Sequence, residues 1–243
     1  MLQVKGKWAL ITGASRGIGY QIAMFMAAKG CNLVLHSRSV DNTQALLQTV
    51  RGMGIDAYSI SAELSDIDDI NRMLDEIESK GTHIDILFND AAIQVAYRSD
   101  FWNTPVEDFR KSFDVNTIAP AVICYRLVPK MMEKGFGRII NTTSGIRNEP
   151  AQAAYSASKA ALDKFTTDLS TVVDGTDVIL SLMDPGWCRT DLGGSQAPNS
   201  VESAVPGVVV GAFLDDKKSG RFISAQDYAG LTLEAAVLKA YTL

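Results

Sequence analysis

Tyr155 and Lys159 are the residues whose types and spacing best suit acid–base chemistry. They lie one helical turn apart in an alanine-rich segment that continues through Leu162 and Phe165, so both side chains should project from one helix face. A tyrosine normally loses its proton near about pH 10, but a neighbouring ammonium favours the phenolate and brings the hydroxyl into range for proton transfer near neutral pH. Because the chain has seven tyrosines, such a pair can also arise by chance. The pair therefore indicates a catalytic site only together with a second motif.

A glycine-rich turn near the N-terminus is that second motif. It runs from Ile11 to Gly19, where the first expected strand gives way to the first expected helix. Such a turn must bring backbone N–H groups close to a pyrophosphate, which excludes Cβ atoms at the contacts, and the helix N-terminus adds partial positive charge. A tight structural turn is the alternative, but the GxxxGxG spacing inside a strand-helix-strand pattern favours a dinucleotide. The expected contacts are Gly13, Ser15, Arg16, Gly17, Ile18 and Gly19.

The end of the second expected strand selects the dinucleotide. An acidic residue there binds the 2′-hydroxyl of the adenosine ribose, whereas an arginine accepts a 2′-phosphate. The chain reads Leu35-His36-Ser37-Arg38-Ser39, with no acid at the strand end, and Asp41 is more typical of a helix cap. Arg38 and Arg16 together could clamp a phosphate through charge-assisted hydrogen bonds, unless both are ordinary surface arginines. These residues predict NADP(H) rather than NAD(H).

The elements that must hold these residues alternate between short apolar, β-branched runs and longer amphipathic segments. This alternation is typical of strand-helix-strand units that build a parallel sheet. The clearest helical segment runs from Ser65, as its N-cap, to Lys80. Thr104 followed by Pro105 and Glu107 marks another start, with an N-cap, a first helical proline and a capping-box acid. The expected strands are Trp8 to Thr12, Asn32 to His36, Ala57 to Ser61, Ile84 to Asn89, Arg138 to Thr142, Val178 to Met183 and Arg221 to Ser224.

Composition and charge argue against several other classes of protein. The chain has 243 residues, 47% of them hydrophobic and 21% charged, which suits one domain over residues 1–243 with a substantial core. The net charge of -5, without a basic cluster, argues against a nucleic-acid surface. Three widely spaced cysteines and two isolated histidines predict no metal site. Without a signal peptide or an apolar run of about 18 residues, we expect a cytoplasmic protein with no membrane contact.

With the glycine turn and the tyrosine-lysine pair in this order, the sequence resembles the short-chain dehydrogenase/reductase family from Gly6 to about Thr190. The resemblance implies an α/β, three-layer Rossmann-type fold with a seven-stranded, mostly parallel sheet and helices on both faces. It implies that Tyr155 is the catalytic acid/base, and that Lys159 holds the nicotinamide ribose and lowers the tyrosine pKa. Asn116 matches the family asparagine that anchors a water relay behind that lysine.

The catalytic serine of the family has two candidate positions in this chain. The usual spacing before the tyrosine places it at Thr142, whereas local alignment favours Ser144 and implies a shortened Ile146 to Pro150 loop. The hydroxyl would donate a hydrogen bond to the substrate oxygen, where negative charge builds as the hydride arrives. We expect Ser144 in this role; the alternative is a serine that only caps a turn.

Other family positions add contacts to the cofactor. The segment from Pro185 to Thr190 matches the residues that meet the nicotinamide carboxamide, and Glu63-Leu64 stands where the family usually has an aspartate beside the adenine. The Asn89-Asp90-Ala91-Ala92 segment departs from the usual Asn-Asn-Ala-Gly, which leaves the contacts to the adenosine half open, although Asn89 can still brace the central sheet. The resemblance thus adds to the site Glu63, Leu64, Asn89, Ala91, Pro185, Gly186 and Thr190.

Loops above the nicotinamide should choose the substrate. These are Gln94 to Trp102, Ile146 to Pro150 and Gly193 to Pro206, together with Trp187. The aromatic residues Trp102 and Trp187 could stack on an apolar substrate, or they could simply pack in a lid.

The sequence predicts a carbonyl reductase that uses NADPH to reduce an aldehyde or ketone of a small molecule. An alcohol or sugar dehydrogenase that works toward oxidation is the nearest alternative. A regulator that binds NADP(H) without turnover is a third, but it should lack Tyr155, Lys159 or Asn116, and all three are present. The Gly220 to Asp227 stretch does not match the ending of the tetrameric acyl-carrier-protein reductases of the family, so their acyl substrate is not carried over. We expect a homodimer or homotetramer.

Overall fold

Seven strands pair in parallel to form one sheet, with the order β3-β2-β1-β4-β5-β6-β7. The computed structural model describes residues 1–243. The strand order reverses its direction at β1, and open sheets bind ligands beyond the carboxyl ends of the strands at such a point. All seven predicted strands are confirmed, with bounds within two residues of those expected. They are β1 (Trp8–Ile11), β2 (Asn32–Ser37), β3 (Ala57–Ser61), β4 (Ile86–Asn89), β5 (Gly137–Thr142), β6 (Val178–Asp184) and β7 (Arg221–Ser224).

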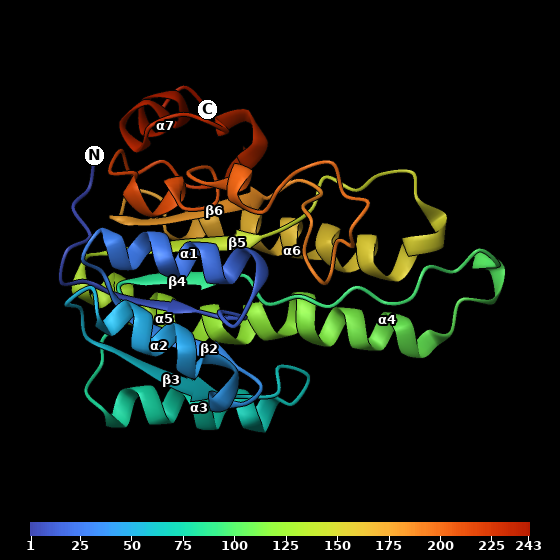
Figure 1. Cartoon of the computed structure of the whole chain (residues 1–243), viewed down its shortest axis with the longest axis horizontal. Helices are drawn as coiled ribbons and strands as arrows, with labels where there is room; N and C mark the ends of the chain where they lie inside the picture. Colours follow the sequence, from blue (N-terminus) through green and yellow to red (C-terminus); the bar gives the residue numbers. More distant parts are fainter.

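Helices cover both faces of this sheet, as Figure 1 shows. They are α1 (Gly17–Ala28), α2 (Gln44–Arg51), α3 (Ile67–Ser79), α4 (Val106–Phe113), α5 (Ala119–Lys134), α6 (Ala153–Val172) and α7 (Leu233–Ala240). Shorter helical turns are η1 (Val40–Thr43), η2 (Phe101–Asn103), η3 (Asp114–Ile118), η4 (Pro150–Gln152), η5 (Glu202–Ala204), η6 (Val210–Phe213) and η7 (Ala225–Tyr228). No helix of the chain has both the length and the hydrophobicity needed to cross a membrane.

Two hydrophobic cores lie on the two faces of the sheet. Because successive side chains of a strand point to opposite faces, β1 sends Ala9 and Ile11 into one core and Leu10 into the other. The first core includes residues of α1, α2 and α7, and the second includes residues of α3, α5 and α6. The predicted Rossmann-type fold, with a parallel sheet buried on both faces, is confirmed.

Helix α3 begins at Ile67, and its cap is Asp66 rather than the predicted Ser65. The Asp66 carboxylate accepts hydrogen bonds from two backbone N–H groups of the first turn, at 2.9 and 3.2 Å. The Ser65 hydroxyl instead donates to the carboxylate of Glu63 at 3.0 Å. The prediction is wrong because the neighbouring carboxylate both accepts these bonds and places negative charge at the positive end of the helix dipole.

Helix α4 begins at Val106, and the predicted cap at Thr104 is also wrong. The Thr104 hydroxyl donates to the carbonyl of Phe101 at 2.8 Å and so belongs to the preceding turn η2. Pro105 takes the N-cap position instead of the first helical position. Glu107 does lie in the first turn, where its charge suits the helix dipole.

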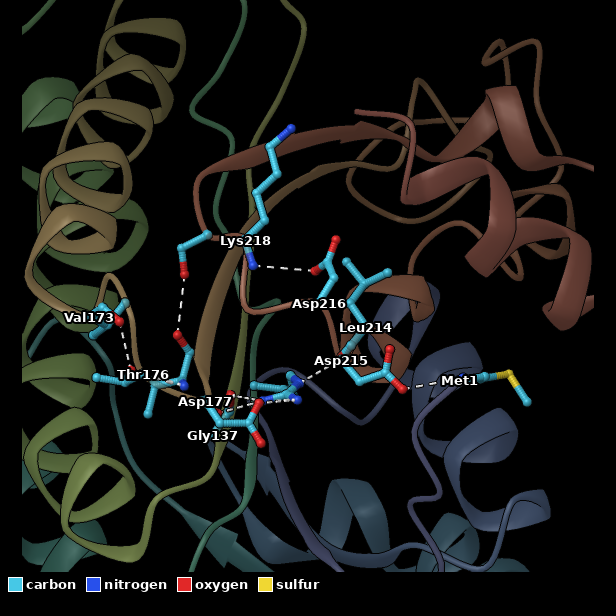
Figure 2. Close-up of polar contacts among 12 residues, drawn as sticks. Met1, Gly137, Val173, Thr176, Asp177, Leu214, Asp215, Asp216 and Lys218 are labelled. Atoms are coloured by element: carbon cyan, nitrogen blue, oxygen red, sulfur yellow. Dashed lines mark hydrogen bonds and ion pairs between the residues drawn. The ribbon is translucent and has the colours of Figure 1, made fainter.

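A polar cluster joins the starts of β5 and β6 to the segment before β7 (Figure 2). Arg138, whose side chain is 0% exposed, donates to the carbonyl of Leu214 at 2.6 Å. It also donates to the carbonyl and the carboxylate of Asp177, each at 2.7 Å. Next to Leu214, the Asp215 carboxylate pairs with the N-terminal amine of Met1 at 3.3 Å. A buried guanidinium needs such acceptors because it has lost its water, so this cluster serves to hold the sheet and its flanking segment together.

Candidate active site

The glycine turn between β1 and α1 is as closely packed as its sequence predicts. Gly13 has a φ of +73°, and a Cβ there would lie 2.9 Å from the Cα of Ala91. A Cβ on Gly19 would collide with the carbonyl oxygen of Gly13. Only glycine fits at both positions, and the turn therefore brings the loop after β4 against the start of α1.

The N-terminus of α1 is open to a ligand. Arg16 occupies the N-cap position and makes no side-chain capping bond, so the first N–H groups of the helix have no side-chain partner there. Ser15, Gly17 and Ile18 lie in the same turn. Free N–H groups at the positive end of a helix dipole suit a phosphate. The turn and the helix start therefore fit the pyrophosphate of a dinucleotide.

The two arginines expected to hold a 2′-phosphate are both exposed. The Arg16 guanidinium pairs with Asp191, in the loop after β6, at 2.9 Å, and Arg38 directly follows β2. The expected cap role of Asp41 is wrong, because the Ser39 hydroxyl accepts a hydrogen bond from the backbone N–H of Asp41 at 3.4 Å. Asp41 therefore lies in the first turn of η1. The residue that follows β2 is an arginine and not an acidic residue.

Helix α6 places Tyr155 and Lys159 on one buried face beside the end of β5, with exposed fractions of 8% and 2%. The Lys159 ammonium donates to the carbonyl of Thr142, the last residue of β5, at 2.7 Å. The Ser144 hydroxyl, just beyond the same strand, lies close enough to the Tyr155 hydroxyl to oppose the rise in its pKa. The structure thus brings the predicted acid, lysine and serine together at the carboxyl end of the sheet.

The two candidate positions for the catalytic serine have different partners. The Thr142 hydroxyl donates to the carboxylate of Asp90 at 2.9 Å. The Ser144 oxygen accepts a hydrogen bond from the backbone N–H of Ile146 at 3.2 Å and lies against the Tyr155 hydroxyl. A hydroxyl beside the phenol can donate to the same oxygen that the phenol protonates, so the geometry favours Ser144.

Burial dominates the pKa values of the tyrosine and the lysine. It raises the pKa of Tyr155 to about 12, although the hydrogen bond with Ser144 acts in the opposite direction. It lowers the pKa of Lys159 to about 8, although nearby carboxylates, Asp90 first, favour the ammonium. Lys159 is not among the groups that set the pKa of Tyr155 here, so a lowering of that pKa by the lysine stays a prediction. Loss of water around the phenol is the largest effect on it, and the ammonium is directed to the Thr142 carbonyl.

Asn116 lies in the π-helical turn η3, between α4 and α5, and its side chain is 0% exposed. Such turns frequently occur at functional sites. Its amide oxygen accepts from the backbone N–H of Ile93 at 2.9 Å, and its amide nitrogen donates to the Ile93 carbonyl at 2.9 Å and to the Ser158 hydroxyl at 3.0 Å. Asn116 thus ties the loop after β4 to α6 beside Lys159, and its role in a water relay stays a prediction.

The end of β4 is tied to both of its neighbouring strands. The Asn89 amide donates to the Asn141 side chain on β5 at 2.8 Å, which is the predicted brace of the central sheet. The backbone N–H groups of Asp90 and Ala91 donate to the Thr12 hydroxyl, just after β1, at 3.0 and 3.1 Å. Thr12 is a site residue that sequence reasoning missed, since its hydroxyl acts on residues far along the chain.

The loop after β6 reaches the glycine turn. A Cβ on Gly17 would lie 3.3 Å from the Thr190 methyl group. Pro185 and Gly186 begin this loop, and the Gly186 N–H donates to the carboxylate of Asp184 at 2.9 Å. The predicted nicotinamide segment and the predicted phosphate turn are therefore neighbours.

Glu63 and Leu64 follow β3 at the border of the site. The Glu63 carboxylate accepts hydrogen bonds from the backbone N–H and the hydroxyl of Ser65, at 3.1 and 3.0 Å, and so faces its own loop. Leu64 is buried. Contacts of either residue with an adenine stay predictions.

The loops expected to choose the substrate meet one another. The Tyr97 hydroxyl donates to the carboxylate of Glu149 at 3.1 Å, which joins the Gln94 to Trp102 loop to the loop after Ser144. Trp102 is 86% exposed, and the Trp187 indole donates to the Gly193 carbonyl at 2.7 Å. Neither tryptophan lies in the hydrophobic core. Their contacts with a substrate stay predictions.

Three carboxylates around Lys159 are further residues that sequence reasoning missed. Asp90, Asp163 and Asp184 come from three different elements, and each favours the lysine ammonium. The signal for Asp90 lies in the sequence, because it stands in the segment that departs from the family pattern. Asp163 and Asp184 carry no such signal, since only the tertiary structure brings them to the lysine.

Comparisons with known proteins identify the family. Residues 7–200 match the short chain dehydrogenase family. Ketoacyl reductase HetN of Nostoc sp. is 30% identical over 219 residues, which cover 84% of this chain and 76% of HetN. A short chain dehydrogenase of Pseudocercospora fijiensis is 29% identical over 195 residues, which cover 79% of this chain and only 62% of that relative. The chain therefore belongs to the short-chain dehydrogenase family of oxidoreductases, as its motifs predict.

A solved structure supports the same assignment. The crystal structure of a metagenomic short-chain oxidoreductase in complex with NADP is 27% identical and superposes with a TM-score of 0.77. The match covers 92% of this chain and 98% of the metagenomic chain. The seven-stranded parallel sheet and its flanking helices are therefore those of the family.

Proposed function

We propose that this chain is an NADP(H)-dependent oxidoreductase that reduces the carbonyl group of a small molecule. The observation that carries the proposal is the contact between the Tyr155 and Ser144 hydroxyls beside buried Lys159, at the carboxyl end of β5. The glycine turn and the open start of α1 form a phosphate cradle at the same edge of the parallel sheet. The NADP in the metagenomic oxidoreductase and the name of HetN as a ketoacyl reductase support the choice of cofactor and reaction.

The side chains of the site divide the proton chemistry between them. Bound NADPH would supply the hydride. The Ser144 and Tyr155 hydroxyls donate hydrogen bonds to the substrate oxygen, and Tyr155 gives its proton to that oxygen as negative charge builds there. The Lys159 ammonium, which the Thr142 carbonyl holds in place, stabilises the negative charge that develops on the phenol oxygen.

The pKa of the phenol suits a proton donor. Burial raises the pKa of Tyr155 to about 12, so the hydroxyl keeps its proton at neutral pH. Carbonyl reduction needs that proton for donation, whereas alcohol oxidation begins with a phenolate that accepts one. For reduction, Tyr155 therefore starts at neutral pH in the protonated state that proton donation requires.

Assays with both cofactors in both directions test the proposal. The purified chain should oxidise NADPH with members of an aldehyde and ketone panel, and should reduce NADP⁺ with alcohols and polyols more slowly at neutral pH. Faster turnover of NADP⁺ with a polyol would indicate the alcohol or sugar dehydrogenase. NADPH binding without turnover of any compound would indicate a regulator.

Removal of the Ser144 hydroxyl tests the choice between the two serine positions. Ser144→Ala should lower kcat for carbonyl reduction about a hundredfold, because one donor to the developing negative charge is lost. The Kd for NADPH, followed by its fluorescence, should stay unchanged. The control is Ser170→Ala, at the far end of α6, where the hydroxyl donates to the Thr167 carbonyl at 2.7 Å. A wild-type kcat in Ser144→Ala would remove this residue from the catalytic group.

Arg38 is expected to decide between the two dinucleotides. Arg38→Ala should weaken NADPH binding about tenfold and leave NADH binding unchanged, because only NADPH carries the 2′-phosphate. Fluorescence titration with each cofactor measures both constants. Arg110→Ala, on the exposed face of α4, is the control and should leave both unchanged. Equal weakening toward NADPH and NADH would show that Arg38 does not read the phosphate.

We further propose that the chain works in the cytoplasm as a homodimer or homotetramer. The support is the family resemblance together with the reduced cysteines, which are free and buried. Light scattering of the purified chain tests the assembly, and a monomer at assay concentration would contradict it.

A further inference from the structure

Asp90 stands where the family usually has an asparagine, and its carboxylate has partners on two sides. On one side it accepts a hydrogen bond from the Thr142 hydroxyl at 2.9 Å. On the other it lies against Gly19, at the start of α1, because a Cβ on Gly19 would lie 3.0 Å from an Asp90 carboxylate oxygen. The carboxylate therefore joins the end of β5 to the glycine turn.

Thr142 also holds the lysine. Its carbonyl accepts from the Lys159 ammonium at 2.7 Å, while its hydroxyl donates to Asp90. Thr142 thus forms hydrogen bonds with both Lys159 and Asp90, whose opposite charges attract each other.

Other charged groups surround the lysine from the elements packed against it. Asp163 lies on α6 itself and bonds with the Thr143 hydroxyl, and Arg147 acts on Asp163 from the loop after β5. Asp184, at the end of β6, accepts from the Gly186 N–H at 2.9 Å. These carboxylates are directed to the strand ends and the loop after β6, and Asp90 is the one that lies against the glycine turn.

We propose that Asp90 is a positioning residue, which fixes the glycine turn against the end of β5 and supplies the negative charge that keeps the buried Lys159 ammonium charged. A buried ammonium is stable only with a compensating charge, because it has lost its water. The inference rests on the proposed function, since the charged lysine is what stabilises the developing phenolate. An asparagine at this position would keep the shape and the Thr142 bond but would lose the charge.

The directions of the pKa shifts agree with this geometry. Burial lowers the pKa of Lys159 to about 8, and the Asp90 charge is the first of those that oppose the shift. Burial raises the pKa of Asp90 to about 6, which the Thr142 bond and the Lys159 charge oppose. The Asp90 charge also raises the pKa of Tyr155. Loss of that charge should therefore lower the pKa values of both Lys159 and Tyr155, so both would lose their protons at lower pH.

Direct titration of the lysine tests the charge without any need for turnover. In cofactor-free protein labelled with [ε-¹³C]lysine, the Lys159 signal is identified by its loss in Lys159→Met. Asp90→Asn should lower its NMR titration midpoint by about one pH unit. Asp90→Ser should do the same and replaces Asp90→Asn if that variant does not fold. The control is Asp85→Asn, which should leave the Lys159 midpoint unchanged. Asp85 lies at the other end of β4, where its carboxylate accepts from the Trp8 N–H at 2.9 Å. An unchanged Lys159 midpoint in the Asp90 variant overturns the proposal.

The pH profile of kcat/KM for carbonyl reduction gives the second readout. In Asp90→Asn the fall at alkaline pH should begin about one pH unit lower than in the wild type, with the acid plateau kept within a few fold. A uniform loss at every pH would mean a structural role only and would overturn the proposal. A third outcome is that the wild type turns over no substrate in the panel while Asp90→Asn still lowers the Lys159 midpoint. That pair of results would contradict the proposed function and support the electrostatic role of Asp90.

Discussion

Replacement of Tyr155 with phenylalanine is expected to lower kcat for carbonyl reduction by a factor of about 10³ to 10⁴. The phenol is the titratable group that lies beside Ser144, and phenylalanine keeps the ring while removing the hydroxyl. The buried face of α6 should therefore keep its packing. Stopped-flow or steady-state NADPH oxidation measures the loss, and NADPH fluorescence should still report binding close to that of the wild type.

Tyr125→Phe is the matched control for this change. Tyr125 lies on α5, is exposed, and contacts the Phe165 ring with a centroid separation of 5.5 Å. Its hydroxyl has no part in the site, so kcat should stay at the wild-type value. Retained turnover in Tyr155→Phe, at more than a tenth of the wild-type rate, would show that another group donates the proton.

Replacement of Arg138 with methionine should lower the free energy of unfolding by about 3 kcal/mol. Methionine fills part of the space but donates no hydrogen bond. The Leu214 and Asp177 carbonyls, and the Asp177 carboxylate, would then lose their buried donor. Urea unfolding followed by circular dichroism measures the change.

Arg126→Met separates this effect from the loss of any arginine. Arg126 lies on α5 and pairs with Asp75 and with Glu78, at 2.9 Å from the latter, on the surface of α3. Surface ion pairs contribute less than about 1 kcal/mol, so this variant should be nearly as stable as the wild type. An equal fall in the free energy of unfolding in the two variants would mean that the buried cluster stabilises the protein no more than a surface ion pair does.

The strands and the glycine turn are predictable because each has a local cause. Runs such as Val178 to Met183 are apolar on both sides apart from Ser181, which is typical of a parallel strand buried between two helix layers. The turn from Gly13 to Gly19 needs residues without a Cβ, and the chain supplies glycine where the packing demands it. Such requirements leave a pattern in a short stretch of sequence.

The helix caps and the electrostatics of the site depend on competition that a local pattern does not resolve. Ser65 and Asp66 are both good caps, and the aspartate takes the position because its carboxylate bonds two N–H groups of the first turn. The contact between Asp90 and Thr142 joins residues 52 positions apart, so it exists only in the folded chain. The high pKa of Tyr155 likewise arises from burial by distant segments, which the lysine spacing alone does not reveal.

A crystal structure of the chain with NADP⁺ and a carbonyl compound bound tests the proposed site most directly. We predict that the pyrophosphate lies on the glycine turn and that the Tyr155 and Ser144 hydroxyls both lie within hydrogen-bond distance of the carbonyl oxygen, above the nicotinamide ring. A complex in which the ring lies away from these two hydroxyls, or in which the phenol turns away from the bound dinucleotide, would contradict the proposed chemistry.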